Sequence, residues 1–201
     1  GSKYCIGVAN GTDALEIALE SLNLDKGSEV IVPANTWIST AEIVVRLGHK
    51  VVFCDVDLSD YSMLIKDLKK KINKRTKVII PVHLYGNPSN MKIILGLSKK
   101  NNIKIIEDCA QAHGTLYNKK HVGTFGDLGT FSFFPGKNLG AYGDAGGIIT
   151  NNKKYAEKCL RLRNHGSINK YDHTMIGKNS RLDTIQSAIL DIKLKDYKKE
   201  V

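Results

Sequence analysis

The sequence predicts an α/β fold in which helices cover both faces of a mixed, mostly parallel sheet. Short apolar runs alternate with longer amphipathic segments along the first 110 residues. Most of these runs are apolar on both faces, as is typical of parallel strands buried between two layers of helices. No internal repeat, low-complexity tract or linker interrupts the pattern. We therefore expect one domain over residues 1–201.

The individual elements follow from these two patterns. Apolar runs bounded by proline, glycine or charged residues predict strands, and apolar residues three and four apart predict helices. Thr12 or Asp13 is expected to cap the first helix. Before residue 111, the sequence predicts strands at 28–33, 50–57, 77–86 and 103–110, and further helices at 36–48, 61–72 and 90–102. After it, a glycine-rich stretch holds the strands "GTFSFF" and "GGIIT", and helices follow at "KKYAEKCLRLRNHG" and "RLDTIQSAILDIKLKDY".

The chain is basic, with 30 Lys and Arg against 20 Asp and Glu and a formal net charge of +10. Such an excess is compatible with nucleic acid, an acidic membrane surface or an anionic small substrate. The densest basic run, residues 69–77, covers the end of a predicted helix, and we interpret it as a solvated surface. No arginine-rich arm, aromatic sheet motif or zinc spacing supports a nucleic-acid partner. The charge suits a diphosphate-bearing substrate.

Cysteine usage and hydropathy indicate the compartment. The four cysteines are scattered without a C-x-x-C pair, which fits free thiols in a reducing cytoplasm better than a disulfide framework. No apolar stretch approaches the ~18 residues of a membrane-spanning helix. No H-x-x-H or H-E-x-x-H spacing indicates a metal site. We expect a cytoplasmic protein with no membrane span and no bound metal.

Lys137 is the residue on which the functional interpretation depends. It lies between an aromatic run and a glycine-rich run in "FSFFPGKNLGAYGDAGG", residues 131–147. A nucleotide-binding P-loop would need glycine at Phe131 and a hydroxyl residue at Asn138, so that interpretation fails. An exposed loop lysine is the ordinary alternative. A lysine among apolar groups, however, has a lowered pKa and becomes an amine nucleophile toward an aldehyde, for which pyridoxal phosphate is the natural partner.

Other residues match what pyridoxal phosphate requires of a protein. Asp108, at the end of a predicted buried strand, suits the protonated ring nitrogen. The helix start at residues 10–13 and the Ser132 hydroxyl suit the phosphate, and Trp37 suits one face of the ring. Each residue alone has an ordinary explanation as a loop hydrogen-bonder, a helix cap or a core tryptophan. Their combination in one chain favours the cofactor.

The chain resembles the DegT/DnrJ/EryC1/StrS family of sugar aminotransferases, which are fold-type-I pyridoxal-phosphate enzymes. Two very specific blocks are "EDCAQAHG" and "SFFPGK"; the others are "VANGTDAL", "SEVIVPANTWIST", "PVHLYGNPSNM", "GTFGDLGTFSFFPGKNLGAYGDAGG" and "GKNSRLDTIQSAIL". Together they span nearly the whole chain, whereas family members are nearly twice as long. The resemblance implies that residues 1–201 are the central part of the large cofactor-binding domain. The N-terminal start and a C-terminal small domain are expected to be missing.

The resemblance also implies which residues act on the cofactor ring. It implies a Schiff base between Lys137 and pyridoxal phosphate. Asp108 is implied to hold the pyridinium nitrogen, and Gln111 to hydrogen-bond the phenolate oxygen. Trp37 is implied to stack on the ring.

The phosphate is implied to have ligands from two subunits. Gly11, Thr12 and Ser132 would bind it from the same chain as Lys137. Asn179 would reach it from the partner subunit. The resemblance therefore implies a homodimer with shared active sites.

The implied reaction is a two-stage transamination. L-Glutamate donates its amino group, pyridoxamine phosphate carries it, and a nucleotide-linked keto sugar accepts it. Lys137 serves as nucleophile and as general acid/base. The segment "NLGAYGDAGG" resembles members that act on 3-keto sugars.

Three alternatives to this reaction stay open. The first is a 4-keto sugar aminotransferase. The second is a pyridoxal-phosphate-dependent sugar dehydratase, although relatives of that type replace Lys137 with histidine. The third is a non-catalytic regulatory module that binds the cofactor without turnover, which the intact set of cofactor residues opposes.

Overall fold

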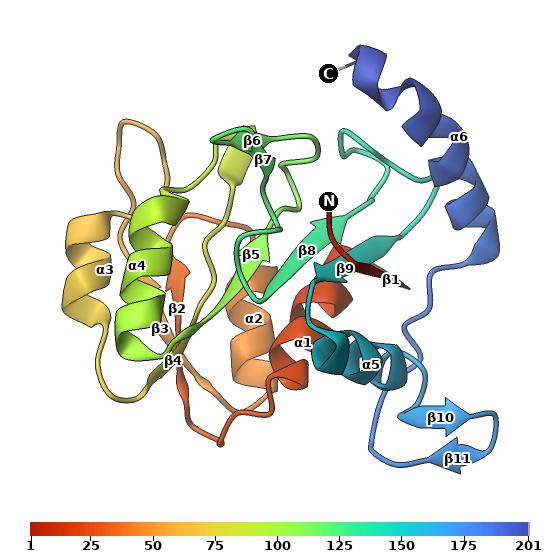
Figure 1. Ribbon diagram of the computed structural model, residues 1–201, viewed down its shortest axis with the longest axis horizontal. Helices are drawn as coiled ribbons and strands as arrows, with labels where there is room; N and C mark the ends of the chain where they lie inside the picture. The colour runs from red at the N-terminus through yellow and green to blue at the C-terminus, as the bar shows by residue number, and fades with distance from the viewer. Residues whose placement is uncertain (201) are drawn as a thin grey trace.

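A seven-stranded sheet with the strand order β1-β9-β8-β5-β4-β2-β3 forms the centre of the molecule (Figure 1). The computed structural model describes residues 1–200 of the chain, with side chains up to residue 197. Strands β3, β2, β4, β5 and β8 are parallel to one another, and β9 and β1 continue the sheet antiparallel. The predicted mixed, mostly parallel α/β fold is therefore confirmed. The strands are β1 (Tyr4–Val8), β2 (Glu29–Pro33), β3 (Lys50–Cys54), β4 (Thr76–Ile79), β5 (Lys104–Asp108), β8 (Leu128–Ser132) and β9 (Gly146–Thr150).

Six α-helices accompany the sheet in the described residues. They are α1 (Gly11–Ser21), α2 (Ser39–Arg46), α3 (Ile65–Lys71), α4 (Met91–Asn101), α5 (Lys153–Leu162) and α6 (Thr184–Glu200). Smaller elements are the 3-10 turn η1 (Leu84–Gly86) and two hairpins, β6 (Leu116–Tyr117) with β7 (Lys120–His121) and β10 (Ser167–Asn169) with β11 (Asp172–His173). Figure 1 shows α3 and α4 together at one end of the molecule and α6 at the other.

Alternating residues of the central strands build two separate cores. In β2, Val30 and Val32 belong to a core that includes α1, α2 and α5, whereas Ile31 belongs to the core under α3 and α4. In β5, Ile106 likewise belongs to the first core and Ile105 to the second. Successive side chains of a strand point to opposite faces, so this division means that helices cover both faces. The edge strand β3 is less covered, and its Phe53 is 53% exposed.

The predicted elements are present, most of them with shorter bounds, although β4 and β8 begin one residue earlier than predicted and α6 ends later. Strand β1 was not predicted, and neither were the two hairpins. The capping prediction was wrong, because Asn10 is the N-cap of α1 and its Oδ1 accepts a hydrogen bond from the Asp13 N–H at 2.8 Å. This places Thr12 inside the first turn of the helix, two residues after the cap.

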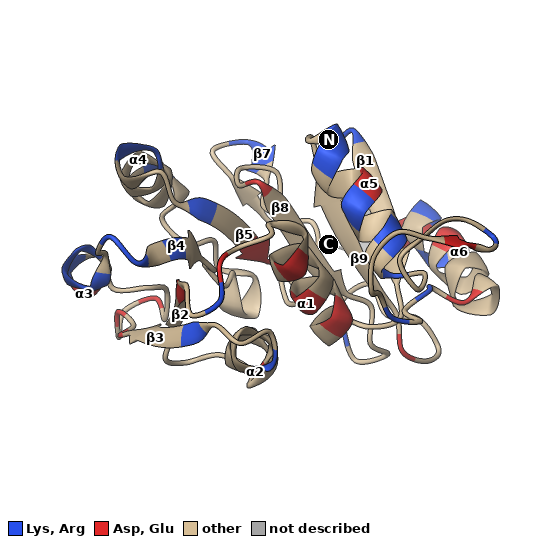
Figure 2. Ribbon diagram, turned by 90° about the horizontal axis from the view of Figure 1, so that it is seen from below, with Lys and Arg blue, Asp and Glu red and all other residues tan. Residues whose placement is uncertain are grey.

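The basic run at residues 69–77 lies on the surface, as expected. Lys69, Lys70 and Lys71 form the last turn of α3 and are exposed, as are the charged residues that follow. Figure 2 shows this blue band on α3 and another on α4. Among the described helices, none has both the length and the apolar content needed to cross a membrane.

Candidate active site

A cavity of about 640 Å³ opens at the carboxyl ends of the central strands, beside the start of α1. Polar residues after a strand converge at such an edge in open α/β sheets. Seven of the eight residues proposed from the sequence line this cavity, and only one does not. The lining residues are Gly11, Thr12, Trp37, Asp108, Gln111, Ser132 and Lys137.

Asp108 ends strand β5 and is buried at 5% exposure. Its Oδ2 accepts a hydrogen bond from the Thr40 hydroxyl at 2.9 Å, and its Oδ1 accepts one from the Ala110 N–H at 3.1 Å. Burial raises the pKa of this carboxyl, and these two hydrogen bonds together with the charge of Lys137 oppose the shift. A buried carboxylate with neutral donors favours a cationic partner, so Asp108 fits the protonated nitrogen of a pyridine ring.

The start of α1 has the properties of an anion site. The N-cap residue Asn10 accepts the Asp13 N–H with its side chain and the Ala14 N–H with its carbonyl. The Gly11 and Thr12 N–H groups have no hydrogen-bond acceptor among the described residues. A Cβ at Gly11 would lie 2.6 Å from Ser132 Cβ, so only glycine lets the helix start against that serine. Free N–H groups and the helix dipole fit a phosphate here.

Lys137 follows strand β8 in a tight turn. Its N–H donates to the Phe134 carbonyl at 2.8 Å, and Gly140 leaves no room for a Cβ, which would lie 2.5 Å from the Pro135 carbonyl oxygen. The side chain is half-buried, less than a lysine enclosed by apolar groups would be. No hydrogen bond or ion pair to its amine is found in the part of the chain that the structure describes. The amine is therefore available to a ligand in the cavity.

Trp37 lies between β2 and α2 at the mouth of the cavity. It is 73% exposed, so the alternative of a core tryptophan is wrong for the described chain. An exposed indole beside a cavity offers a flat face to a ring. Its position is compatible with the predicted stacking role.

Gln111 stands between this cavity and a second one of about 430 Å³, and it lines both together with Lys137. Its Oε1 accepts a hydrogen bond from the Tyr85 N–H at 3.0 Å. The side chain is therefore held by the turn η1 and not by a neighbour in its own segment.

Asn179 is the predicted residue that does not line the cavity. It is exposed and pairs with Asn164 through an isolated antiparallel bridge. The adjacent Lys178 fastens this segment to α1, because its Nζ lies 2.8 Å from Asp13 Oδ1 and 2.9 Å from Glu16 Oε2. The structure thus places Asn179 on an outer surface of the molecule.

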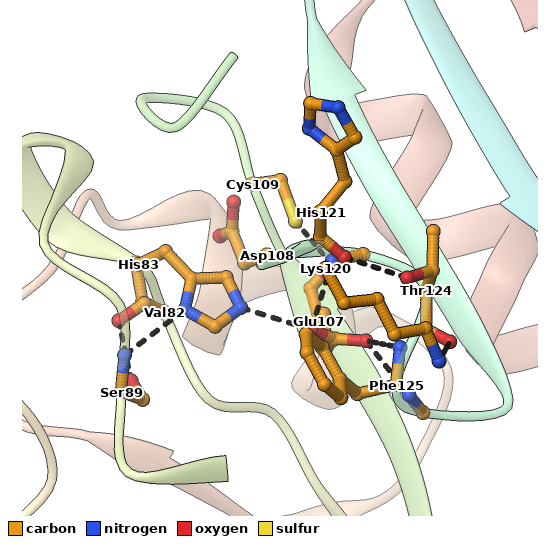
Figure 3. A network of polar contacts seen from close by, with 12 residues as sticks. Val82, His83, Ser89, Glu107, Asp108, Cys109, Lys120, His121, Thr124 and Phe125 are labelled. Carbon is orange, nitrogen blue, oxygen red and sulfur yellow. Dashed lines mark hydrogen bonds and ion pairs between the residues drawn. The ribbon is translucent and has the colours of Figure 1, made fainter. Parts of the chain in front are cut away.

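Glu107 directly precedes Asp108 in the chain and has no role in the hypothesis drawn from the sequence. It is fully buried and accepts hydrogen bonds from the Gly123, Phe125 and Gly126 N–H groups at 2.7–2.8 Å. His83 Nε2 completes the set at 3.1 Å, as Figure 3 shows. These bonds fasten the loop after β7 to the end of β5.

The tautomer of His83 follows from its other partner. The Ser89 N–H points to His83 Nδ1 at 3.1 Å, so Nδ1 is the acceptor and Nε2 carries the proton that binds Glu107. In Figure 3 the Asp108 side chain leads away from this network. The described residues contain no group of three or more His, Cys, Asp or Glu side chains that could hold a metal ion.

Two residues beside the site, Thr40 and His113, have no role in the hypothesis drawn from the sequence. Thr40 reaches Asp108 across 68 residues of sequence, and no local pattern predicts that contact. His113 is 7% exposed, and neither of its ring nitrogens has a hydrogen-bond partner in bonding geometry among the described residues. Burial lowers its pKa to about 4; the Ser132 carbonyl opposes the shift and the charge of Lys137 adds to it.

The fold is that of the fold-type-I pyridoxal-phosphate aminotransferases. The structure of Streptomyces venezuelae DesV in complex with a ketimine intermediate is similar to it with a TM-score of 0.95 at 39% identity, covering 98% of this chain and 53% of DesV. The structure of NtdA from Bacillus subtilis with bound cofactor PMP is similar with a TM-score of 0.89 at 35% identity, covering 94% of this chain and 43% of NtdA.

The chain belongs to the DegT/DnrJ/EryC1/StrS aminotransferase family, because the model of this family matches residues 1–201. A UDP-N-acetyl-3-dehydro-alpha-D-glucosamine 3-aminotransferase of Acidithiobacillus ferrooxidans is 50% identical over 190 residues, covering 94% of this chain and 52% of the relative. A dTDP-3-amino-3,6-dideoxy-alpha-D-galactopyranose transaminase of Aneurinibacillus thermoaerophilus is 50% identical over 194 residues, covering 96% of this chain and 53% of the relative. A "pleiotropic regulatory protein" of Geobacillus stearothermophilus is 47% identical over 192 residues, covering 96% of this chain and 52% of the relative. The chain spans about half the length of these relatives.

Proposed function

We propose that residues 1–201 are the central part of the large domain of a pyridoxal-phosphate-dependent nucleotide-sugar aminotransferase. The start of this domain and a C-terminal small domain would lie outside the chain. The observation that carries the proposal is the meeting of Lys137, Asp108 and the start of α1 around one cavity. These groups come from separate segments and match three different parts of one cofactor.

Six of the residues that line the cavity have definite tasks in this proposal. Bound pyridoxal phosphate supplies a carbonyl that captures amines and a ring that withdraws electrons from the adjacent bonds. Asp108 holds the proton on the ring nitrogen, and the Gly11 and Thr12 N–H groups with Ser132 bind the phosphate. Trp37 covers one face of the ring. Lys137 would form the covalent bond to the carbonyl carbon with loss of water. Once the amino donor had displaced it, the freed Lys137 amine would take the proton from the donor's α-carbon.

The second subunit enters through Asn179. This side chain lies on an exposed segment and does not line the cavity of its own chain, which supports a role at the site of another copy. We propose a homodimer in which Asn179 of each subunit completes the phosphate site of the other. In this arrangement neither active site is complete in a single chain.

The substrate is proposed to be a nucleotide-linked 3-keto sugar, with L-glutamate as the amino donor. Two relatives that share 50% identity with the chain have names that place the amino group at C3 of a nucleotide-linked sugar. A 4-keto sugar is the nearest competitor. Lys137 argues against a dehydratase, in which histidine is expected at this position.

The regulatory alternative has one observation in its favour, namely the name of the Geobacillus stearothermophilus relative. It predicts a cofactor that stays bound and does not react with amino acids. Against it stands the complete set of groups that bind and activate the cofactor, Lys137 and Asp108 above all.

Absorbance of the complete, cofactor-loaded protein separates these functions. We expect a visible band that bleaches on addition of L-glutamate and returns when a nucleotide-linked 3-keto sugar is added. Return with 4-keto sugars alone would move the amination to C4, and a deoxygenated product would indicate a dehydratase. A band that L-glutamate leaves unchanged would overturn the aminotransferase and support the regulatory module.

A further inference from the structure

Tyr85 adopts a backbone conformation that a bulky residue normally avoids. Its φ is 56° and its ψ is 22°, in the left-handed region. For residues other than glycine this conformation costs about 1–2 kcal/mol. The side chain is 73% exposed, so burial of the ring does not explain the strain.

Neighbouring segments hold this turn in place. The Thr115 hydroxyl donates to the Gly86 carbonyl at 3.1 Å, and Asn87 Nδ2 donates to the Asp60 carbonyl at 2.9 Å. The rings of Tyr61 and Tyr85 meet edge to face with centroids 6.3 Å apart. The turn is thus fixed from two sides, as is expected where a strained conformation serves a purpose.

The strained conformation directs one group, the Tyr85 N–H, toward the Gln111 side chain. A backbone N–H can only donate, so the atom of Gln111 that faces it must be the acceptor Oε1. The donor Nε2, with two N–H groups, is then the other end of the amide. No second hydrogen bond to this side chain is found within residues 1–200, and Gln111 lines the cavity that also holds Lys137 and Asp108.

We propose that the Tyr85 backbone N–H is a positioning group that fixes Gln111 as a hydrogen-bond donor toward an anionic ring oxygen of the cofactor. The inference rests on the proposed function, because that function brings the cofactor into this cavity. Without the Tyr85 bond, the amide of Gln111 is free to rotate by half a turn and present an acceptor. An acceptor repels an anionic oxygen, so the turn η1 sets the polarity of the site.

The effect is measurable without turnover. A hydrogen bond donated to an anion favours the charged form, so loss of the donor raises the affinity of the lysine-bound cofactor for a proton. This affinity is read from the pH midpoint of the visible absorbance of the complete, cofactor-loaded protein. We expect Gln111→Leu to raise the midpoint by about one pH unit, a tenfold change in proton affinity.

Three variants of residue 85 and Gln111 test the connection. Tyr85→Pro removes the N–H and cannot take a positive φ, so it should raise the midpoint in the same direction as Gln111→Leu. Tyr85→Gly keeps both the N–H and the left-handed conformation, so its midpoint should stay at the wild-type value. The double variant Tyr85→Pro with Gln111→Leu should shift no further than the larger single shift.

Further variants keep the test decisive. Should Tyr85→Pro fail to fold, an ester in place of the amide at residue 85 deletes the N–H alone and should give the same shift. Gln111→Glu keeps an acceptor for the Tyr85 N–H but turns a second acceptor to the cavity, so it should raise the midpoint at least as far as Gln111→Leu.

Two results would overturn the inference, and they can be told apart from failure of the proposed function. One is a shift in Gln111→Leu without a shift on loss of the N–H. The other is additive shifts in the double variant. Absence of any visible cofactor band in the wild-type protein would instead reject the proposed function and this inference with it.

Discussion

Glu107 and Asp108 end the same strand, but their carboxylates lie on opposite sides of the sheet in different surroundings. Glu107 is fully buried and accepts four hydrogen bonds, three from backbone N–H groups and one from His83. Asp108 accepts one from Thr40 and one from Ala110, and it lines the cavity. The first carboxylate has all its partners within the fold, whereas the second has room for one more.

This difference separates structural from functional acid groups. A buried charge with complete partners stabilises a loop, and the loss of any partner is costly. A buried carboxylate with few partners is a weak stabiliser, but it binds a cation strongly. Two buried histidines repeat the contrast. Both ring nitrogens of His83 are hydrogen-bonded, whereas neither ring nitrogen of His113 has a partner in bonding geometry within the described part of the chain.

The largest expected effect concerns turnover and comes from Asp108→Asn in the complete protein. Loss of the charge removes the partner of the protonated ring nitrogen, so turnover should fall by roughly a hundredfold or more. The amide retains acceptors and donors for Ala110 and Thr40, so the melting temperature should hold. Steady-state kinetics and thermal denaturation measure both quantities, and near-normal turnover would remove Asp108 from its proposed task.

The isosteric change Glu107→Gln is the matched variant on the other side of the strand. Either orientation of the amide turns its NH₂ against N–H donors, so the free energy of unfolding should fall by about 3 kcal/mol. Urea denaturation measures the loss, with Asp108→Asn as the control. Equal losses in the two variants would contradict the division into structural and functional carboxylates.

His113 should make the protein sensitive to mild acid. Its pKa is lowered from 6.5 to about 4 in the folded protein, so below pH 6.5 the unfolded chain binds a proton that the fold excludes. The contribution of His113 to the free energy of unfolding should therefore be constant above pH 6.5. It should lower the stability by up to about 3 kcal/mol as the pH drops to 4.

Denaturation curves at several pH values measure this loss in the wild type and in His113→Phe. Phe131 and Phe133 already lie against the ring with centroids 5.6 Å away, so an aromatic replacement suits the site. The difference between the two proteins isolates His113 from other titrating groups. If the free energy of unfolding of His113→Phe fell as steeply below pH 6.5 as that of the wild type, His113 would not be the cause of the acid sensitivity.

The smallest expected effect comes from Thr40→Val, which removes the hydroxyl that binds Asp108. The pKa of Asp108 should rise further, and affinity for pyridoxal phosphate should weaken by about 1 kcal/mol, several-fold in the dissociation constant. Thr36→Val is the control, because the Thr36 hydroxyl bonds Thr40 at 3.2 Å and has no bond to Asp108. A larger effect of Thr36→Val than of Thr40→Val in a cofactor titration would contradict this assignment.

Hydropathy periodicity predicted most of the fold, because buried parallel strands and amphipathic helices leave strong patterns. It missed β1, in which Cys5 is exposed and which pairs with β9, a strand far from it in the sequence. The wrong cap has a local reason, since residues 10–13 contain several side chains able to cap a helix and only the backbone selects Asn10.

The lining of the cavity was predictable where its residues end or follow a strand, as with Asp108 and Gln111. It was not predictable where tertiary contacts decide the geometry. The bond from Thr40 to Asp108 and the left-handed Tyr85 that holds Gln111 have no local sequence signal. Such supporting contacts are visible only in the folded chain.

Borohydride reduction of the complete, cofactor-loaded protein, followed by peptide mass mapping, is the decisive experiment on the role of Lys137. We expect the cofactor to be fixed to Lys137 alone, and we expect Lys137→Ala to carry no label while its melting temperature is unchanged. A label on another lysine, such as Lys178 beside the start of α1, would show that Lys137 is not the lysine that binds the cofactor.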